Sequence, residues 1–156
     1  MFGEPWIWIT GVGVLIALAI ALGWATWHHP RRTSVERARK LFHLQRERLE
    51  FRFVQLAGNS YKPRGLELAD CDFEDEISFA RDRHNGRLRA YVAVTIRFQA
   101  IEGGGMEDNP NVNNLKAGSA EFRLDNSDWG TDGKVLFNVN PVEAIQRYQQ
   151  ELELVE

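Results

Sequence analysis

The chain has 156 residues, of which 44% are hydrophobic and 26% are charged, and its formal net charge is -3. This length suits one domain with an appendage. The composition is that of a folded protein, and the slightly acidic total indicates neither a nucleic-acid binder nor a disordered tail. The single cysteine, Cys71, excludes an internal disulfide framework and a cysteine-based metal cluster.

Residues 6–27 run 22 positions without a charged side chain. At about 1.5 Å per residue, a helix of this length matches a hydrocarbon core of roughly 30 Å. Tryptophans stand at both ends, where an indole can keep its ring in the apolar boundary and its N–H among the headgroups. The pattern predicts a single transmembrane helix and an anchor over residues 1–29. A buried core helix is the alternative, but a small protein could hardly cover it on every side.

The flanks of this segment predict its orientation. Only Glu4 and the terminal amine precede it, which disfavours a cleaved signal peptide, and a basic run follows it. Positive residues in short flanks tend to stay cytoplasmic, so we expect the amino terminus outside and the following domain in the cytoplasm. Next to a bilayer, Arg31, Arg32 and Arg37 are expected to attract anionic lipid headgroups; the alternative is a solvated face that only fixes topology.

Small residues recur at every fourth position of the predicted span, at Gly13, Ala17, Ala21 and Ala25. On a helix they lie close to one line and would let a second helix approach closely, which predicts association with a partner protein or a second copy in the membrane. The alternative is that glycine and alanine are simply frequent in spanning helices.

A long basic amphipathic helix follows, within residues 30–57. Pro30 interrupts the span, and Thr33 with Glu36 forms a capping box that starts the helix near residue 34. Gly58-Asn59 is a typical stop signal, which predicts a helix over 34–57. Its apolar positions recur at helical spacing and predict a face that packs on a sheet: Val35, Ala38, Phe42, Leu49, Phe53 and Leu56, flanked by Leu41 and Leu44.

The stretch D-C-D-F-E-D-E, Asp70 to Glu76, places five carboxylates in seven residues. A calcium loop of the EF-hand type fails here, because its sixth position would be Asp75 rather than glycine and its twelfth would be Arg81 rather than glutamate. A catalytic carboxylate pair stays open. The alternation of polar and apolar residues favours one wet face of a strand instead.

A second alternating segment, residues 88–99, follows Asn85-Gly86, the strongest short-range signal for a β-hairpin. Placing these two residues at the turn pairs residues whose numbers sum to 171. Asp75 would then point inward opposite Ile96, where an unpaired carboxylate is costly, unless a bulge or a helix arginine compensates. The predicted pairs are Phe79–Val92, Ile77–Val94, Phe73–Phe98, Glu74–Arg97 and Asp82–Arg89.

Residues 102–114 form a polar loop whose three glycines could cradle an anion, although a mobile loop is the better interpretation. Two more strands are expected, at 120–125 and 134–139. Trp129 between them either marks a ligand cleft or covers the end of the core. An Asn-Pro-Val-Glu start at Asn140 predicts a short carboxyl-terminal helix. Its apolar stripe would be Val142, Ile145, Tyr148, Leu152 and Val155.

These elements predict an α+β protein: a transmembrane helix, a long amphipathic helix, an antiparallel sheet of about four strands and a short helix, with 58–156 joining 34–57 in one soluble domain. Over residues 34–140 the order of elements resembles the cystatin-like and NTF2-like folds, in which a curved sheet wraps a helix. This resemblance rests on shape and implies no active-site residues.

Two functions follow as hypotheses. The first is a single-pass membrane protein without enzymatic activity, whose soluble domain binds another protein or steadies a membrane complex. The second is a ligand-binding or weakly enzymatic pocket between sheet and helix, with Asp75 and Trp129 as its candidate residues. We expect no cofactor, no metal site and no nucleic-acid partner, because the sequence holds no motif for them.

Overall fold

The computed structural model describes residues 16–18, 20 and 34–155. Among these residues, no helix is both long enough and apolar enough to cross a membrane. The predicted span, 6–27, lies outside the described part except for residues 16–18 and 20, which are helical and exposed. Of the predicted helix-packing and lipid-facing residues, Gly13, Ala21, Ala25, Arg31 and Arg32 also lie outside it.

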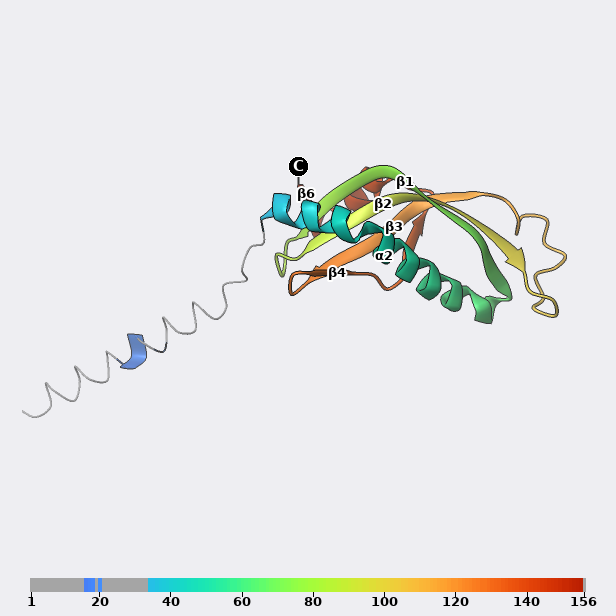
Figure 1. The fold of residues 1–156 in the computed structure, drawn as a ribbon, viewed down its shortest axis with the longest axis horizontal. Helices are drawn as coiled ribbons and strands as arrows, with labels where there is room; N and C mark the ends of the chain where they lie inside the picture. The colour runs from blue at the N-terminus through green and yellow to red at the C-terminus, as the bar shows by residue number, and fades with distance from the viewer. Residues whose placement is uncertain (1–15, 19, 21–33, 156) are drawn as a thin grey trace, which may run out of the picture. The chain divides into compact units, whose positions relative to one another are not determined.

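The chain divides into two units, Met1–Arg32 and Thr33–Glu156. The second is an α+β domain in which a long helix, α2, lies along one face of a bent antiparallel sheet (Figure 1). The sheet has six strands, rather than the predicted four or so. The elements are α2 Val35–Tyr61, the short 3-10 helix η1 Lys62–Arg64, β1 Leu66–Asp82, β2 Leu88–Ala100, β3 Lys116–Asp125, β4 Asp128–Gly130, β5 Val135–Phe137, α3 Pro141–Arg147 and β6 Leu152–Val155.

Helix α2 begins close to where the sequence predicts, with Ser34 as its N-cap. The Ser34 side chain accepts a hydrogen bond from the N–H of Arg37. The predicted end at Gly58 is wrong, because the helix continues to Tyr61. The chain reverses at Gly65, whose φ of 73° is one that glycine adopts at little cost, after Pro63 has disfavoured further α-helix.

The predicted hairpin between β1 and β2 is present, but its register is two residues away from the expected one. Arg81 pairs with Leu88 and Ile77 pairs with Val92, so that paired numbers near the turn sum to 169. The loop is longer than a two-residue turn because the Asp82 carboxylate accepts the N–H groups of His84 and Asn85. A shift of two keeps the paired side chains near the turn on their predicted faces.

Two irregularities in β1 change the pairing further along, between Leu68 and Asp70 and between Phe73 and Ile77. Phe73 therefore pairs with Val94 instead of the predicted Phe98. The expectation that Asp75 points inward opposite Ile96 is wrong. Asp75 lies in the second bulge with a fully exposed side chain, and Ile96 pairs with Cys71.

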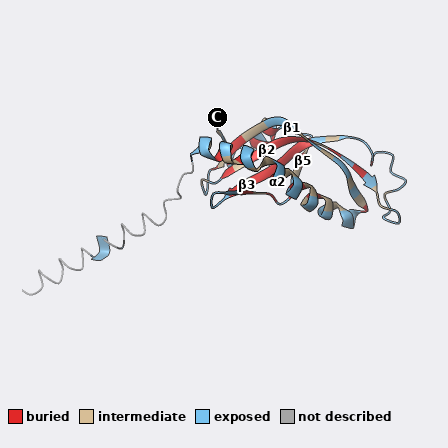
Figure 2. Ribbon diagram, viewed as in Figure 1, coloured by how far each residue is buried: buried red, intermediate tan, exposed pale blue. Residues whose placement is uncertain are grey.

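Aromatic side chains fill the space between α2 and the sheet. Phe42 stacks edge-on against Phe79, Phe122 and Trp129, with ring centroids 5.1–5.8 Å apart. Figure 2 shows the buried residues concentrated in the strands beneath α2. Of the predicted helix stripe, Ala38, Phe42, Leu49 and Phe53 are buried, but Leu44 is 84% exposed.

The carboxyl-terminal segment differs from its prediction. Helix α3 starts with the expected capping box between Asn140 and Glu143 but ends at Arg147. Leu152 and Val155, predicted to lie on this helix, belong to β6, which pairs antiparallel with Phe79–Asp82 of β1. Their alternation suits a strand, and the unpaired backbone of β1 offers hydrogen bonds that a longer helix could not make.

Candidate functional site

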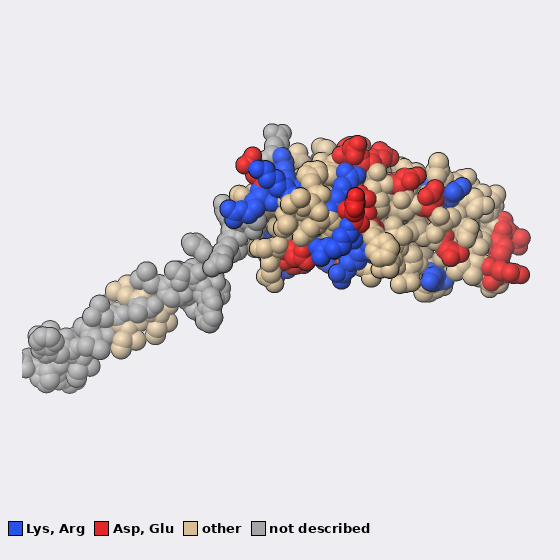
Figure 3. Space-filling model, in the orientation of Figure 1, with Lys and Arg blue, Asp and Glu red and all other residues tan. Residues whose placement is uncertain are grey.

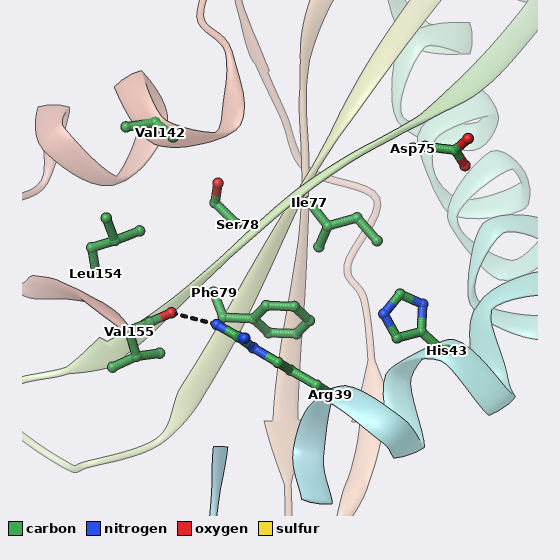
Figure 4. Close-up of a pocket in the computed structure, with 9 residues that line it drawn as sticks. All are labelled: Arg39, His43, Asp75, Ile77, Ser78, Phe79, Val142, Leu154 and Val155. Carbon is green, nitrogen blue, oxygen red and sulfur yellow. Dashed lines mark hydrogen bonds between the residues drawn. The ribbon is translucent and has the colours of Figure 1, made fainter. Parts of the chain in front are cut away.

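An open hollow of about 460 Å³ lies where the first half of α2 faces β1 and the end of β6. It is lined by Arg39, His43, Asp75, Ile77, Ser78, Phe79, Val142, Leu154 and Val155 (Figure 4). The Arg39 guanidinium lies 5.2 Å from the centre of the Phe79 ring and donates a hydrogen bond of 2.9 Å to the Val155 carbonyl oxygen. Arg39 is therefore occupied in fastening α2 to the last strand.

Asp75 stands at the rim of this hollow. Arg46 of α2 reaches it, with 3.3 Å between guanidinium and carboxylate, and also donates to the Glu74 carbonyl oxygen at 2.7 Å. The same arginine pairs with Glu50 one turn along the helix, at 2.6 Å. Both compensations considered for Asp75, a bulge and a helix arginine, are present. An exposed carboxylate that is already paired with an arginine gives no geometric sign of a binding or catalytic role.

Trp129 lies elsewhere, in the core. Its side chain is 2% exposed, packs on Phe42 and Phe79, and donates its indole N–H to the Ala38 carbonyl oxygen at 2.9 Å. The two candidate pocket residues are thus not brought together, because Trp129 does not line the hollow that Asp75 borders. Of the basic residues expected near lipid, Arg37 is exposed in the first turn of α2.

A second group of charged side chains lies on the opposite face of the sheet. Arg89 bridges two buried carboxylates, Asp82 at 2.9 Å and Glu121 at 3.2 Å, and Lys134 approaches Glu121 at 3.3 Å. Burial alone would raise the pKa of Asp82, but the N–H groups of its loop and the Arg89 guanidinium lower it overall. The predicted Asp82–Arg89 contact is confirmed, although Ala80 is the backbone partner of Arg89. This network satisfies its own charges.

The glycine-rich loop supplies its own anion. Backbone N–H groups at Gly103, Gly104, Gly105 and Glu107 lower the pKa of the Glu107 carboxyl, with the Glu107 N–H as the largest cause. The loop also packs close to the backbone of Gly65, whose carbonyl oxygen accepts a hydrogen bond from Ile101 at 3.0 Å. The backbone of its three glycines therefore favours a carboxylate of the same loop, which disfavours a second anion there.

The described residues show neither a cluster of metal ligands nor an activated cysteine nucleophile. No three His, Cys, Asp or Glu side chains are grouped there to hold a metal ion. Burial and the neighbouring Asp72, Asp70 and Glu50 carboxylates raise the pKa of the Cys71 thiol to about 12, which disfavours a nucleophilic thiolate.

The comparisons with known proteins add no relative. No protein-family model, no curated protein and no solved structure matches the chain.

Sequence reasoning missed two arginines that organise the site, Arg39 and Arg46. Both lie on α2 at positions next to the buried stripe, which is the one signal that could have pointed to them.

Proposed function

We propose that this chain is a single-pass membrane protein without enzymatic activity, whose α+β domain mediates protein interaction or the assembly of a membrane complex. The observation that carries the proposal is the uncharged 22-residue segment with tryptophans at both ends. The described residues within it, Ile16, Leu18 and Ile20, have side chains that are 53–65% exposed, as side chains that face lipid would be.

The packing of the domain also supports this proposal, because aromatic side chains fill the space between helix and sheet. In the alternative function, a ligand would lie between helix and sheet, where aromatic rings already pack at 5.1–5.8 Å. The remaining hollow is open, and its two charged lining residues, Arg39 and Asp75, are already paired. Surface recognition of another protein needs neither an enclosed pocket nor a perturbed carboxylate.

The line of small residues on the predicted span suggests how the protein would assemble, by helix–helix contact in the membrane. Close approach of two helices at Gly13, Ala17, Ala21 and Ala25 would join two copies or a copy and a partner helix. Arginines at the start of the domain, with Arg31 and Arg32 nearest the bilayer and Arg37 behind them, would hold that end near anionic lipid and keep the domain on the cytoplasmic side.

The test is the mass of the full chain purified in mild detergent, measured by light scattering. We expect a complex larger than one chain, and we expect Ala17→Leu with Ala21→Leu to reduce its size by widening the helix contact. Val14→Leu with Leu18→Ile is the matched control, because it changes apolar residues off the small-residue line. A chain that is repeatedly recovered alone, as a monomer, contradicts the proposal.

A further inference from the structure

Strand β1 is an edge strand over most of its length. On one side it pairs with β2 from Leu66 to Arg81, but on the other side β6 covers only Phe79–Asp82. Within the described part of the chain, no strand pairs with the outer side of Leu66–Ser78. The Cys71 N–H donates to the Asp70 carboxylate and the Glu74 carbonyl oxygen accepts from Arg46. The N–H and C=O groups that are left unpaired along such an edge are a template for another extended chain.

The side chains facing α2 along this edge are incompletely covered. Leu66, Leu68, Cys71, Phe73 and Ile77 pack against the core but are only half-buried. The matching row on β2 is 0–2% exposed: Val92, Val94, Ile96 and Phe98. From Arg89 to Ile96, β2 has a strand on each side, which helps to cover its row. A further strand beside β1 would cover the half-buried row with its own apolar side chains.

The outward row of the same edge is acidic. Glu67, Asp70, Asp72, Glu74 and Glu76 are exposed, and in Figure 3 acidic side chains line the upper rim of the domain, where Figure 1 places β1. Three of these have partners: Glu67 accepts from Gln99, Asp70 pairs with Arg97 and Glu74 accepts from Thr95. In the described residues, neither Asp72 nor Glu76 has an ion pair or a side-chain hydrogen bond.

Together these features define the chemistry of an added strand. Its side chains would alternate between apolar residues toward α2 and basic residues opposite the acidic row, since successive residues of a strand point to opposite faces. A second copy of the β1 edge does not fit, because it would bring two acidic rows together and like charges opposite each other destabilise a ladder. The partner must therefore be basic.

We propose that the edge of β1 from Leu66 to Phe73, extending toward Ile77, binds an extended segment of a partner protein in which basic and apolar residues alternate. The backbone of the partner adds a strand to the sheet, and its basic side chains lie against Asp72 and Glu76. This inference rests on the proposed role in protein interaction and specifies the partner's chemistry. The acidic stretch would then select a basic partner segment at the edge of the strand.

The test uses the full chain in non-ionic detergent and a labelled peptide of about twelve residues that alternates lysine and valine, a length that spans Leu66–Ile77 at about 3.3 Å per residue. Fluorescence anisotropy measures binding, and hydrogen exchange reports the backbone. We expect saturable binding below about 1 mM, with added protection of amides within Leu66–Phe73. A peptide that alternates glutamate and valine should not bind.

Asp72→Lys with Glu76→Lys should weaken binding at least about tenfold, through the loss of two attractive contacts and the gain of repulsion. Glu36→Lys with Glu151→Lys is the matched control, since it makes the same charge change at exposed positions in the first turn of α2 and just before β6, away from Leu66–Phe73, and should leave affinity within about twofold. On the natural chain, N-methylation of the peptide backbone should abolish binding, because it removes the N–H donors of a ladder.

Three results would overturn the inference: no binding at about 1 mM, equal affinity for the two charge variants, or binding without added protection along β1 that survives N-methylation. The third result would show that the peptide binds through charge alone and adds no strand to the sheet. If the peptide does not bind but the chain still forms a complex in detergent, the strand-edge inference is contradicted and the proposed function stands. A chain recovered only as a monomer would remove the proposed function itself.

Discussion

Asp82 is the residue on which the β1–β2 hairpin depends. Its side chain is 6% exposed, and it holds the loop through the N–H groups of His84 and Asn85 and the sheet through Arg89. These donors recognise the charged form, so they stabilise the folded state only while the carboxylate is ionised.

Replacing Asp82 by asparagine should lower the free energy of unfolding by about 1–3 kcal/mol at pH 7, because charge-assisted hydrogen bonds to a buried carboxylate are weakened. The folded pKa of Asp82 is lowered, so its contribution is complete above the ordinary aspartate pKa of about 4 and is lost as pH falls through the lower folded value. Denaturant unfolding between about pH 2 and pH 7 measures this. Equal pH dependence of the natural chain and the variant would contradict it.

Cys71 should react slowly with thiol reagents in the folded chain. With its pKa raised to about 12, chiefly by burial and then by Asp72, very little thiolate exists at pH 8. Alkylation with iodoacetamide, followed by mass spectrometry, should be far slower than in the denatured chain. Asp72→Asn should speed it, whereas Glu102→Gln, remote along the chain, should not. Rates that match the denatured chain would show that Cys71 is not shielded.

At the scale of elements, the loop before β5 is fitted to α2 through Gly133. Its φ is 73°, and a Cβ added there would lie 2.6 Å from the Ala57 amide nitrogen. Gly103 has a similar φ of 76° but open space around the same position. Comparing alanine substitutions at these two glycines therefore distinguishes the cost of backbone strain from the cost of a steric clash.

Gly103→Ala should cost about 1–2 kcal/mol in the free energy of unfolding, the penalty for the left-handed conformation. Gly133→Ala should cost about 1–3 kcal/mol more, because the loop must move away from α2. Denaturant unfolding of the full chain in detergent compares the two variants. Equal losses would mean that the loop and α2 can separate without cost.

Several elements could be predicted from the sequence because local pattern decides them. Helical spacing places Phe42, Leu49 and Phe53 in the core, alternation gives β1 and β2, and the Asn140 capping box starts α3. The faces of the hairpin strands also follow, since alternation survives a register shift of two residues.

Other elements could not be predicted, because tertiary contacts override local pattern. A three-residue strand such as β4 has too few positions for alternation to appear, and Leu152 fits a helical stripe as well as a strand until the free edge of β1 selects the strand. The bulge that exposes Asp75 depends on Arg46, which lies 29 residues away in the chain. The sequence therefore predicts that Asp75 is compensated, but it does not predict the outward position of its side chain.

At the scale of the whole molecule, the domain carries two surfaces of opposite charge. Basic side chains gather over the first turns of α2 and acidic ones along β1 (Figure 3). If the domain is cytoplasmic as proposed, alkaline phosphatase fused after Glu156 should be inactive in bacterial cells, and a fluorescent protein that matures only in the cytoplasm should be bright. The reverse pattern would place the domain on the other side of the membrane and contradict the orientation inferred from Arg31 and Arg32.

The central claim is that residues 6–27 anchor the chain in a membrane. Its most direct test is extraction of membranes with alkaline carbonate, which releases peripheral proteins and retains integral ones. We predict that the natural chain stays with the membranes. The variant Leu15→Arg with Leu18→Arg should be released, because each central arginine costs about 2.5–3.5 kcal/mol of insertion free energy. Release of the natural chain into the soluble fraction would contradict the account.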